Sequence, residues 1–270
     1  MKTILLLAGL LLLSLSCISK SQSPATYQCP MKCEGDKFYE ESGTCPVCGM
    51  KLTSVAASGQ VKVVGAMSDV MHKNQLSGVI RLDTIPNREH LFGLGPVEYL
   101  TGEILIDGGK TLVSTVASDG SIKIEESPAV KAPFFVYARV EQWMEKTLPE
   151  DVQTLDGLST FLDESTRDHE RPFVFRLTAQ LKEGDIHIVN LAKGSTVHSR
   201  EEAHKGQQSY RLENEDVELI GFFSTKHQGV FTHHDSYVHI HLVSADGKKM
   251  GHLDGMTIKK GSAKLYLSAN

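Results

Sequence analysis

Hydrophobic and polar side chains alternate with a period of two along the segment Tyr-Val-His-Ile-His-Leu-Val near the C-terminus. Its aliphatic residues share one face, and His239 and His241 share the other, which is typical of a half-buried β-strand. The Asp-Gly pair at 246–247 is a preferred two-residue hairpin turn, because both positions tolerate a positive φ. The adjacent residues His233 and His234 just upstream are interpreted as loop residues, with metal ligation as the alternative.

The predicted hairpin brings three imidazoles together without any tertiary assumption. His241 is expected opposite His252, and His239 opposite Asp254, with Cβ atoms about 4.5–5.5 Å apart across the strands. Three histidines that leave one coordination position open describe a catalytic site for Zn²⁺ or another divalent first-row ion. Asp254 is expected to orient a histidine from outside the coordination sphere. For any single histidine, a satisfied polar role is the alternative.

The other secondary-structure signals are short and mostly of the strand type. Strands are expected at Gly102–Ile106, Thr111–Thr115, Ser121–Glu125, Pro133–Val140, Phe173–Leu181 and Asp185–Leu191. Apolar residues at helical spacing predict one helix near Leu155–Asp163 and an entry helix that includes Val64, Met67, Val70 and Met71. Few helices and many short strands predict a β-rich α+β fold.

The first residues of the chain have the pattern of an export signal. Lys2 precedes an apolar run from Ile4 to Leu13 that is too short to cross a bilayer, and Cys17 follows small residues at its end. This arrangement resembles a bacterial lipobox, in which Cys17 is lipidated; plain cleavage of the signal is the alternative. We therefore expect an exported protein of the bacterial cell envelope, anchored by lipid and facing the periplasm.

All five cysteines lie within the first 48 residues, so the remainder of the chain folds without disulfides. Cys29 and Cys33, followed by Cys45 and Cys48, form two knuckles whose spacing suits a tetrahedral thiolate site. The patterns Tyr-x-Cys-Pro-Met and Cys-Pro-x-Cys-Gly-Met resemble the small, zinc-ribbon-like heavy-metal-binding domain of bacterial metal-handling proteins. The expected ion is Zn²⁺, or Cu⁺ with two nearby methionines as soft ligands. Two disulfides are the alternative.

These segments divide the chain into five parts. We expect a signal at 1–17, a linker at 18–26, the cysteine module at 27–53, a small-residue linker at 54–60 and the main domain at 61–270. The formal net charge is -5 and no lysine- or arginine-rich run is present, which argues against a nucleic-acid partner. The expected partners are metal ions, a small molecule and, through the lipid, the membrane; the sequence leaves a homodimer open.

Two stretches of the main domain point to a family. The first contains His90-Leu-Phe-Gly-Leu-Gly95 and Gly102-Glu-Ile-Leu-Ile-Asp-Gly108, and the second contains Ile220-Gly-Phe-Phe223 ahead of the histidines. Together with Tyr-Val-His-Ile-His and the later Gly-His pair, they resemble the acetolactate decarboxylase family over about residues 60–258. The resemblance implies two sheet-containing subdomains with the metal where they meet.

The resemblance also implies roles for individual residues. His239, His241 and His252 would hold zinc. Glu103 would donate the proton that completes acetoin when acetolactate, a 2-hydroxy-3-oxo acid, is decarboxylated. Arg176, within Phe-Val-Phe-Arg-Leu, matches the family's arginine in part and would grip the substrate carboxylate. Without the resemblance, the local sequence predicts an exposed strand carboxylate for Glu103 and a surface arginine for Arg176.

The chain departs from the family near its end. The family places a second glutamate there, but this chain has no carboxylate after Asp254, which becomes the candidate to replace it. Three classes of function therefore remain. The first is a metal-dependent carboxy-lyase acting on acetolactate, and the second is a non-catalytic envelope lipoprotein that binds or senses metal. The third is a protein that binds another hydroxy-keto acid or a sugar-like ligand.

Overall fold

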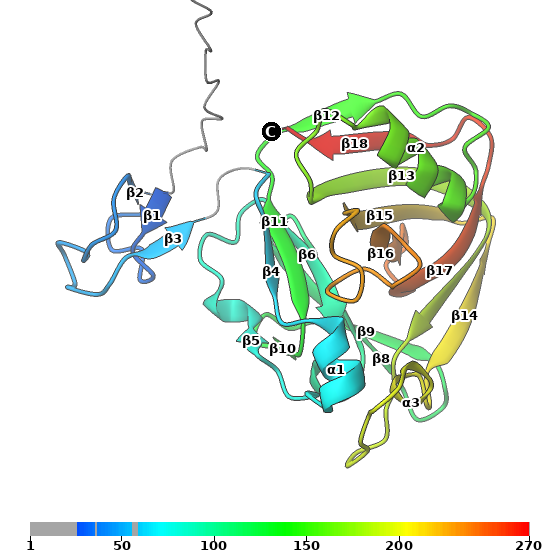
Figure 1. The fold of residues 1–270 in the computed structure, drawn as a ribbon, viewed down its shortest axis with the longest axis horizontal. Coiled ribbons are helices and arrows are strands. Elements are labelled where there is room, and N and C mark those ends of the chain that lie inside the picture. The colour runs from blue at the N-terminus through cyan, green and yellow to red at the C-terminus, as the bar shows by residue number, and fades with distance from the viewer. Residues whose placement is uncertain (1–25, 36, 56–58, 270) are drawn as a thin grey trace, which may run out of the picture.

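The computed structural model describes residues 26–35, 37–55 and 59–269. The predicted signal segment and its Cys17 lie outside the described residues. Among the helices of the described ranges, none is long and apolar enough to span a bilayer. Figure 1 shows the cysteine module standing beside a larger body that contains the two main sheets.

The cysteine module is a small antiparallel sheet with the strand order β2-β1-β3. Its strands are β1 (Thr26–Gln28), β2 (Phe38–Tyr39) and β3 (Thr53–Val55). Its buried apolar cluster consists of Cys29, Cys45 and Leu52. A core of this size contributes little burial free energy, so the module requires a further constraint such as a bound metal.

The first large sheet is antiparallel and has the strand order β4-β11-β6-β7-β8-β9. Its strands are β4 (Val61–Val64), β6 (Leu91–Pro96), β7 (Glu103–Asp107), β8 (Lys110–Val116), β9 (Ile122–Glu126) and β11 (Phe135–Arg139). Every residue of β6 is buried because side chains pack against both faces of this central strand. A short pair, β5 (Ile80–Arg81) with β10 (Lys131–Ala132), lies beside the sheet.

The second large sheet has the order β12-β18-β13-β15-β16-β17, with β14 paired to β13 as a branch. Its strands are β12 (Trp143–Lys146), β13 (Phe173–Ile188), β14 (Gln208–Glu213), β15 (Asp216–Phe223), β16 (Val238–Ser244), β17 (Met250–Ile258) and β18 (Lys264–Ser268). The helices are α1 (Met67–Lys73), α2 (Leu155–Ser165) and the single turn α3 (Arg200–Ala203), and two 3₁₀ turns span Leu82–Thr84 and Glu98–Leu100.

Strand β13 is long enough to close the second sheet on itself. Its first half pairs with β15, and its second half pairs with β17, so that β13, β15, β16 and β17 form a ring. Register shifts between Leu181 and Glu183 and between Asp185 and Ile186 mark β-bulges, which bend a strand and increase its twist. The bend turns the second half of β13 toward the histidine hairpin.

The two largest apolar cores of the described residues stabilise this arrangement. One fills the ring and is covered by α2, whose Leu158 and Leu162 are fully buried. The other lies between the two large sheets, where Leu94 and Leu105 pack with Ile220 and Phe222. Because β7 also contacts β17, residues at the start of β7 face the histidine strands across this interface.

The β-rich α+β fold class expected from the sequence is confirmed, with two corrections of detail. The two strands expected at Phe173–Leu181 and Asp185–Leu191 are one strand. The polar residues between them lie at β-bulges, which shift the register but do not end the pairing with β17. Val64 belongs to β4 rather than to the entry helix. Gly65, with φ +69°, separates the strand from the helix, since few other residues adopt that conformation.

Candidate metal centre

Strands β16 and β17 place the three predicted histidines on one side of the second sheet. His241 and His252 are directly paired across these strands, as the sequence predicts. The ring centroids are 5.1 Å apart for His239 and His241, 4.9 Å for His239 and His252, and 5.6 Å for His241 and His252. Imidazoles bound to one tetrahedral zinc at 2.0–2.1 Å have centroids roughly 5 Å apart, so the spacing fits a shared ion.

The connection between these strands differs from the expected two-residue turn. Of the Asp-Gly pair, Gly247 has a positive φ of 69° but Asp246 does not, so the mirror-image turn predicted for this pair is not formed. The reversal begins instead with a bond from the Gly247 N–H to the Ser244 carbonyl oxygen. The Asp246 carboxylate accepts bonds from the Ser244 hydroxyl and the Lys248 N–H. The longer loop preserves the register because Ser244 remains bonded to Lys249.

The three imidazoles are buried and largely without partners in the protein. Their exposed fractions are 3% for His239, 0% for His241 and 7% for His252. Nδ1 of His239 and both ring nitrogens of His241 are buried without a hydrogen bond. Burial lowers the pKa of all three, to about 3 for His241, so the rings are neutral near pH 7 and retain lone pairs for a metal. One ligand atom from each lies within 4.8 Å of the others.

Glu103 reaches this cluster from the first sheet. It opens β7, is 3% exposed, and its Oε1 accepts a hydrogen bond of 3.2 Å from the backbone N–H of Val189. Its Oε2 lies 3.5 Å from Nε2 of His241. Burial raises the pKa of Glu103 to about 8, so this carboxyl group retains its proton near neutrality. The exposed-strand alternative for Glu103 is wrong.

Asp254 pairs with a histidine that the sequence did not single out. Its Oδ1 lies 2.7 Å from Nδ1 of His187, on the second half of β13. The pairing of Leu253 with Ile186 and of Gly255 with Asp185 leaves Asp254 at the bulge, and the pairing of β16 with β17 ends at His241 and His252. The expected position opposite His239 is therefore not formed, because β17 changes partner at this point.

The contact between His187 and Asp254 affects the imidazole charge. Burial lowers the pKa of His187, but the hydrogen bond to the Asp254 carboxylate outweighs it, and the net pKa is raised. His187, His252 and Asp254 also form a group that could hold a metal. However, the 2.7 Å separation is that of a hydrogen bond, whereas nitrogen and oxygen ligands of one tetrahedral ion lie about 3.3 Å apart. Asp254 thus orients His187.

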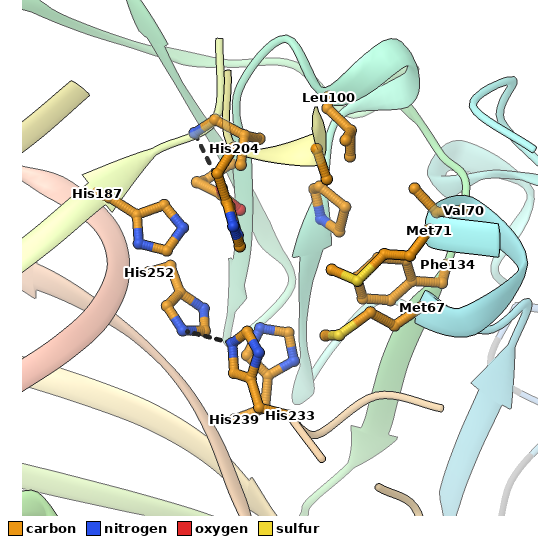
Figure 2. Close-up of a pocket in the computed structure, with 14 residues that line it drawn as sticks. Met67, Val70, Met71, Leu100, Phe134, His187, His204, His233, His239 and His252 are labelled. Atoms are coloured by element: carbon orange, nitrogen blue, oxygen red, sulfur yellow. Dashed lines mark hydrogen bonds between the residues drawn. The ribbon is translucent and has the colours of Figure 1, made fainter. Parts of the chain in front are cut away.

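His239 and His252, together with three other histidines, line a cavity of about 40 Å³ between the two sheets and α1. Figure 2 shows His187, His252, His233 and His239 along one side, with Met67 and Met71 of α1 and Phe134 on the other. Its further lining residues are Val70, Pro96, Leu100, Glu103, Val189, Ala203 and His204. A space of this size holds a few water molecules.

A second, polar cavity of about 270 Å³ adjoins the first. His233 and His252 line both cavities, so they form the wall between them. Arg200 and Asp254 line this second cavity, which is called the outer cavity below. It brings polar side chains next to the histidine cluster.

Arg176 does not line either cavity. It pairs with Ile220, which in turn pairs with His241, so it lies two strands away from the cluster in the same row. Its guanidinium forms an ion pair with Glu218. The contact with Glu218 has the largest effect on the pKa of Arg176, which is raised. The surroundings of Arg176 are thus those of a charge already paired within the sheet interface.

The four cysteines of the module converge as expected. Sγ of Cys29 lies 3.8 Å from Sγ of Cys33 and 3.5 Å from that of Cys48, and none of the four forms a disulfide. Two thiolates on one tetrahedral zinc at about 2.3 Å are about 3.8 Å apart, so the sulfurs fit a shared ion. A backbone hydrogen bond at Cys33 lowers the pKa of Cys29 to about 6, which favours its thiolate, whereas the side-chain hydrogen bond to Cys48 raises the pKa of Cys33.

Sequence reasoning missed His187, His204 and Arg200 and left His233 as a loop residue. His187 shows the same signal as the predicted ligands, since it alternates with Ile186 and Ile188. A single alternating histidine is nevertheless more often a satisfied polar residue, and the signal gains weight only once β13 is known to pair with β17. His204 and Arg200 flank a single helical turn that carries no comparable pattern.

The fold and the site define a β-rich protein in which a buried histidine cluster that could hold a metal ion faces a carboxyl group from a second sheet. A family model described as alpha-acetolactate decarboxylase matches residues 65–269, and one described as heavy metal binding domain matches residues 26–55. The chain therefore belongs to the alpha-acetolactate decarboxylase family and carries an N-terminal heavy-metal-binding domain.

Solved structures agree with this assignment at the level of the fold. The acetolactate decarboxylase of Bacillus subtilis subspecies spizizenii is 18% identical, with a TM-score of 0.63, and the match covers 78% of this chain and 86% of that one. A Staphylococcus aureus protein of unknown function, described as similar to alpha-acetolactate decarboxylase, is 14% identical, with a TM-score of 0.62 and coverages of 78% and 85%. The curated proteins contain no significant match.

Proposed function

We propose that this protein decarboxylates acetolactate to acetoin at a divalent metal, expected to be Zn²⁺, held by His239, His241 and His252. The observation that carries the proposal is the convergence of three neutral, buried imidazoles beside the buried carboxyl of Glu103. Family membership supports a decarboxylase activity. An ion bound there would supply a Lewis acid that polarises adjacent oxygens of a hydroxy-keto acid.

Glu103 is the proposed proton carrier. Its Oε2 faces His241, and its Oε1 is held by the Val189 N–H, so one carboxyl oxygen is fixed and the other is directed at the cluster. Burial keeps a proton on this carboxyl in the metal-free site, and a nearby cation would favour the carboxylate. The group therefore has a pKa that the site can adjust, which general acid–base catalysis near neutral pH requires.

The outer cavity is the proposed substrate entry. Arg200 lines it together with His252, whereas Arg176 is bound to Glu218 and lines neither cavity. A guanidinium is well suited to a carboxylate through parallel N–H donors. We therefore assign the carboxylate-binding role to Arg200, and Arg176 becomes a structural ion-pair residue of the interface.

Purified protein loaded with Zn²⁺ and given racemic acetolactate tests the reaction through acetoin formation. We expect metal-dependent acetoin from the wild type, a loss of about 10²–10⁴-fold in Glu103→Gln, and full activity in the exposed control Glu125→Gln. Absence of metal-dependent acetoin overturns the enzyme. Elemental analysis of His241→Ala and Cys45→Ser, each expected to lose one of two metal sites, tests the ligands separately.

A second candidate is a non-catalytic envelope protein that binds or senses metal. The observation that favours it is the four-cysteine module, which provides a second set of metal ligands on the same chain. Protein that binds metal at both sites but forms no acetoin supports this candidate. The lipid anchor at Cys17 is proposed for either function, since it would hold the metal sites at the outer face of the membrane.

A further inference from the structure

We propose that His233 is a fourth imidazole ligand of the histidine site, on the coordination position that a three-histidine site leaves open. Its Nε2 lies 3.3 Å from Nε2 of His252. Two nitrogens at 2.0–2.1 Å from one tetrahedral zinc are about 3.3–3.4 Å apart, so this pair has the spacing of two ligands of one ion. The inference rests on the histidine metal site of the proposed function.

The ring distances place His233 on the His252 side of the cluster. The centroid of the His233 ring is 5.1 Å from that of His252 and 6.5 Å from that of His239. The first value equals the roughly 5 Å expected for two imidazoles on one ion, and the second requires the His233 ring to move inward. His233 thus lies beside the site and contacts one member of it, His252.

The loop between β15 and β16 fixes where His233 can reach. Phe231 and Thr232, the two residues before it, are fully buried, and the Ser236 N–H donates to the His233 carbonyl oxygen. Upstream, the carbonyl oxygen of Val230 accepts a bond from the N–H of Met67, at the start of α1. The backbone is thus held on both sides of His233, and side-chain rotation is the remaining freedom.

Charge and position support this role. Four neutral imidazoles leave the charge of a divalent ion uncompensated, and the Glu103 carboxyl beside His241 supplies a countercharge. Because His233 also forms part of the wall between the two cavities, an incoming chelating substrate would have to displace it.

Cobalt spectroscopy of the full chain tests the fourth ligand. The wild type, His233→Ala and the neighbouring control His234→Ala, whose side chain is 74% exposed, are titrated with Co²⁺. The spectrum of His241→Ala is subtracted as the contribution of the cysteine module. We expect wild type and His234→Ala to share one visible band pattern, and His233→Ala to shift it and to bind Co²⁺ at least about tenfold more weakly.

The outcomes separate the two proposals. If His233→Ala retains the wild-type band and affinity, the fourth ligand is overturned while the three-histidine site stands. If the wild type itself shows no spectrum beyond that of His241→Ala, both are overturned. A ¹⁵N spectrum of wild-type imidazoles provides a readout independent of any variant. Zn²⁺ should shift the His233 ring nitrogens together with those of His252 and leave His234 unchanged; an unshifted His233 overturns the inference.

Discussion

The carboxyl of Glu103 makes the stability of the metal-free protein depend on pH in a calculable way. Burial raises its pKa from 4.5 to about 8. Between these values the folded chain binds a proton that the unfolded chain releases, so the free energy of unfolding falls by about 1.4 kcal/mol per pH unit. This loss of stability is absent at pH values below the pKa of Glu103 in the unfolded chain. It is complete above the pKa in the folded chain, where it amounts to roughly 3–5 kcal/mol.

The substitution Glu103→Gln removes this dependence, because an amide of nearly the same shape does not ionise. Burying the new amide adds a cost of about 1–3 kcal/mol that is the same at every pH. We therefore expect the free energy of unfolding of the variant, relative to that of the wild type, to increase by roughly 3–5 kcal/mol as the pH rises from about 5 to about 9. Urea unfolding of chelator-treated protein at about pH 5, 7 and 9 measures the difference.

Glu125→Gln is the matched control, because this carboxylate lies on β9 with half of its side chain exposed. It should track the wild type at every pH. Parallel stability profiles for the wild type and Glu103→Gln would refute the reasoning, since they would mean that Glu103 has the same pKa in both states. Saturating Zn²⁺ should reduce the difference, because a nearby cation favours the carboxylate.

Three further predictions concern other parts of the chain. In Gly251→Ala the new Cβ would lie 2.6 Å from the His187 carbonyl oxygen. We therefore expect the free energy of unfolding, measured in urea, to fall by about 1–3 kcal/mol and metal binding to weaken. The control Gly255→Ala, which has open space at its Cβ, should change neither. Thr154→Ala removes the cap on the Gly157 N–H and should cost about 1 kcal/mol by the same assay; an unchanged midpoint would argue against the cap. Cys17→Ser should move the protein from the membrane to the soluble fraction of an expressing bacterium, and retention in the membrane would contradict lipid anchoring.

Local covalent geometry determined the parts of the site that the sequence predicted correctly. Alternation along a strand has a period of two, so His239 and His241 had to share a face wherever the strand lay. The register that pairs His241 with His252 followed from the length of the connection and the apolar pattern, and it survived although the turn itself was of another kind. The spacing of the cysteine knuckles determined their convergence in the same way.

Only the tertiary structure decided what surrounds these ligands. Glu103 is buried and faces His241 because two sheets pack together, and those residues are far apart along the chain. His187 reaches Asp254 because a bulged strand changes partner, and His233 reaches His252 because its loop is anchored to α1. Such contacts depend on the packing of whole elements, whose free energy is summed over many side chains. A short sequence pattern records which face a residue occupies, but not which other element will cover that face.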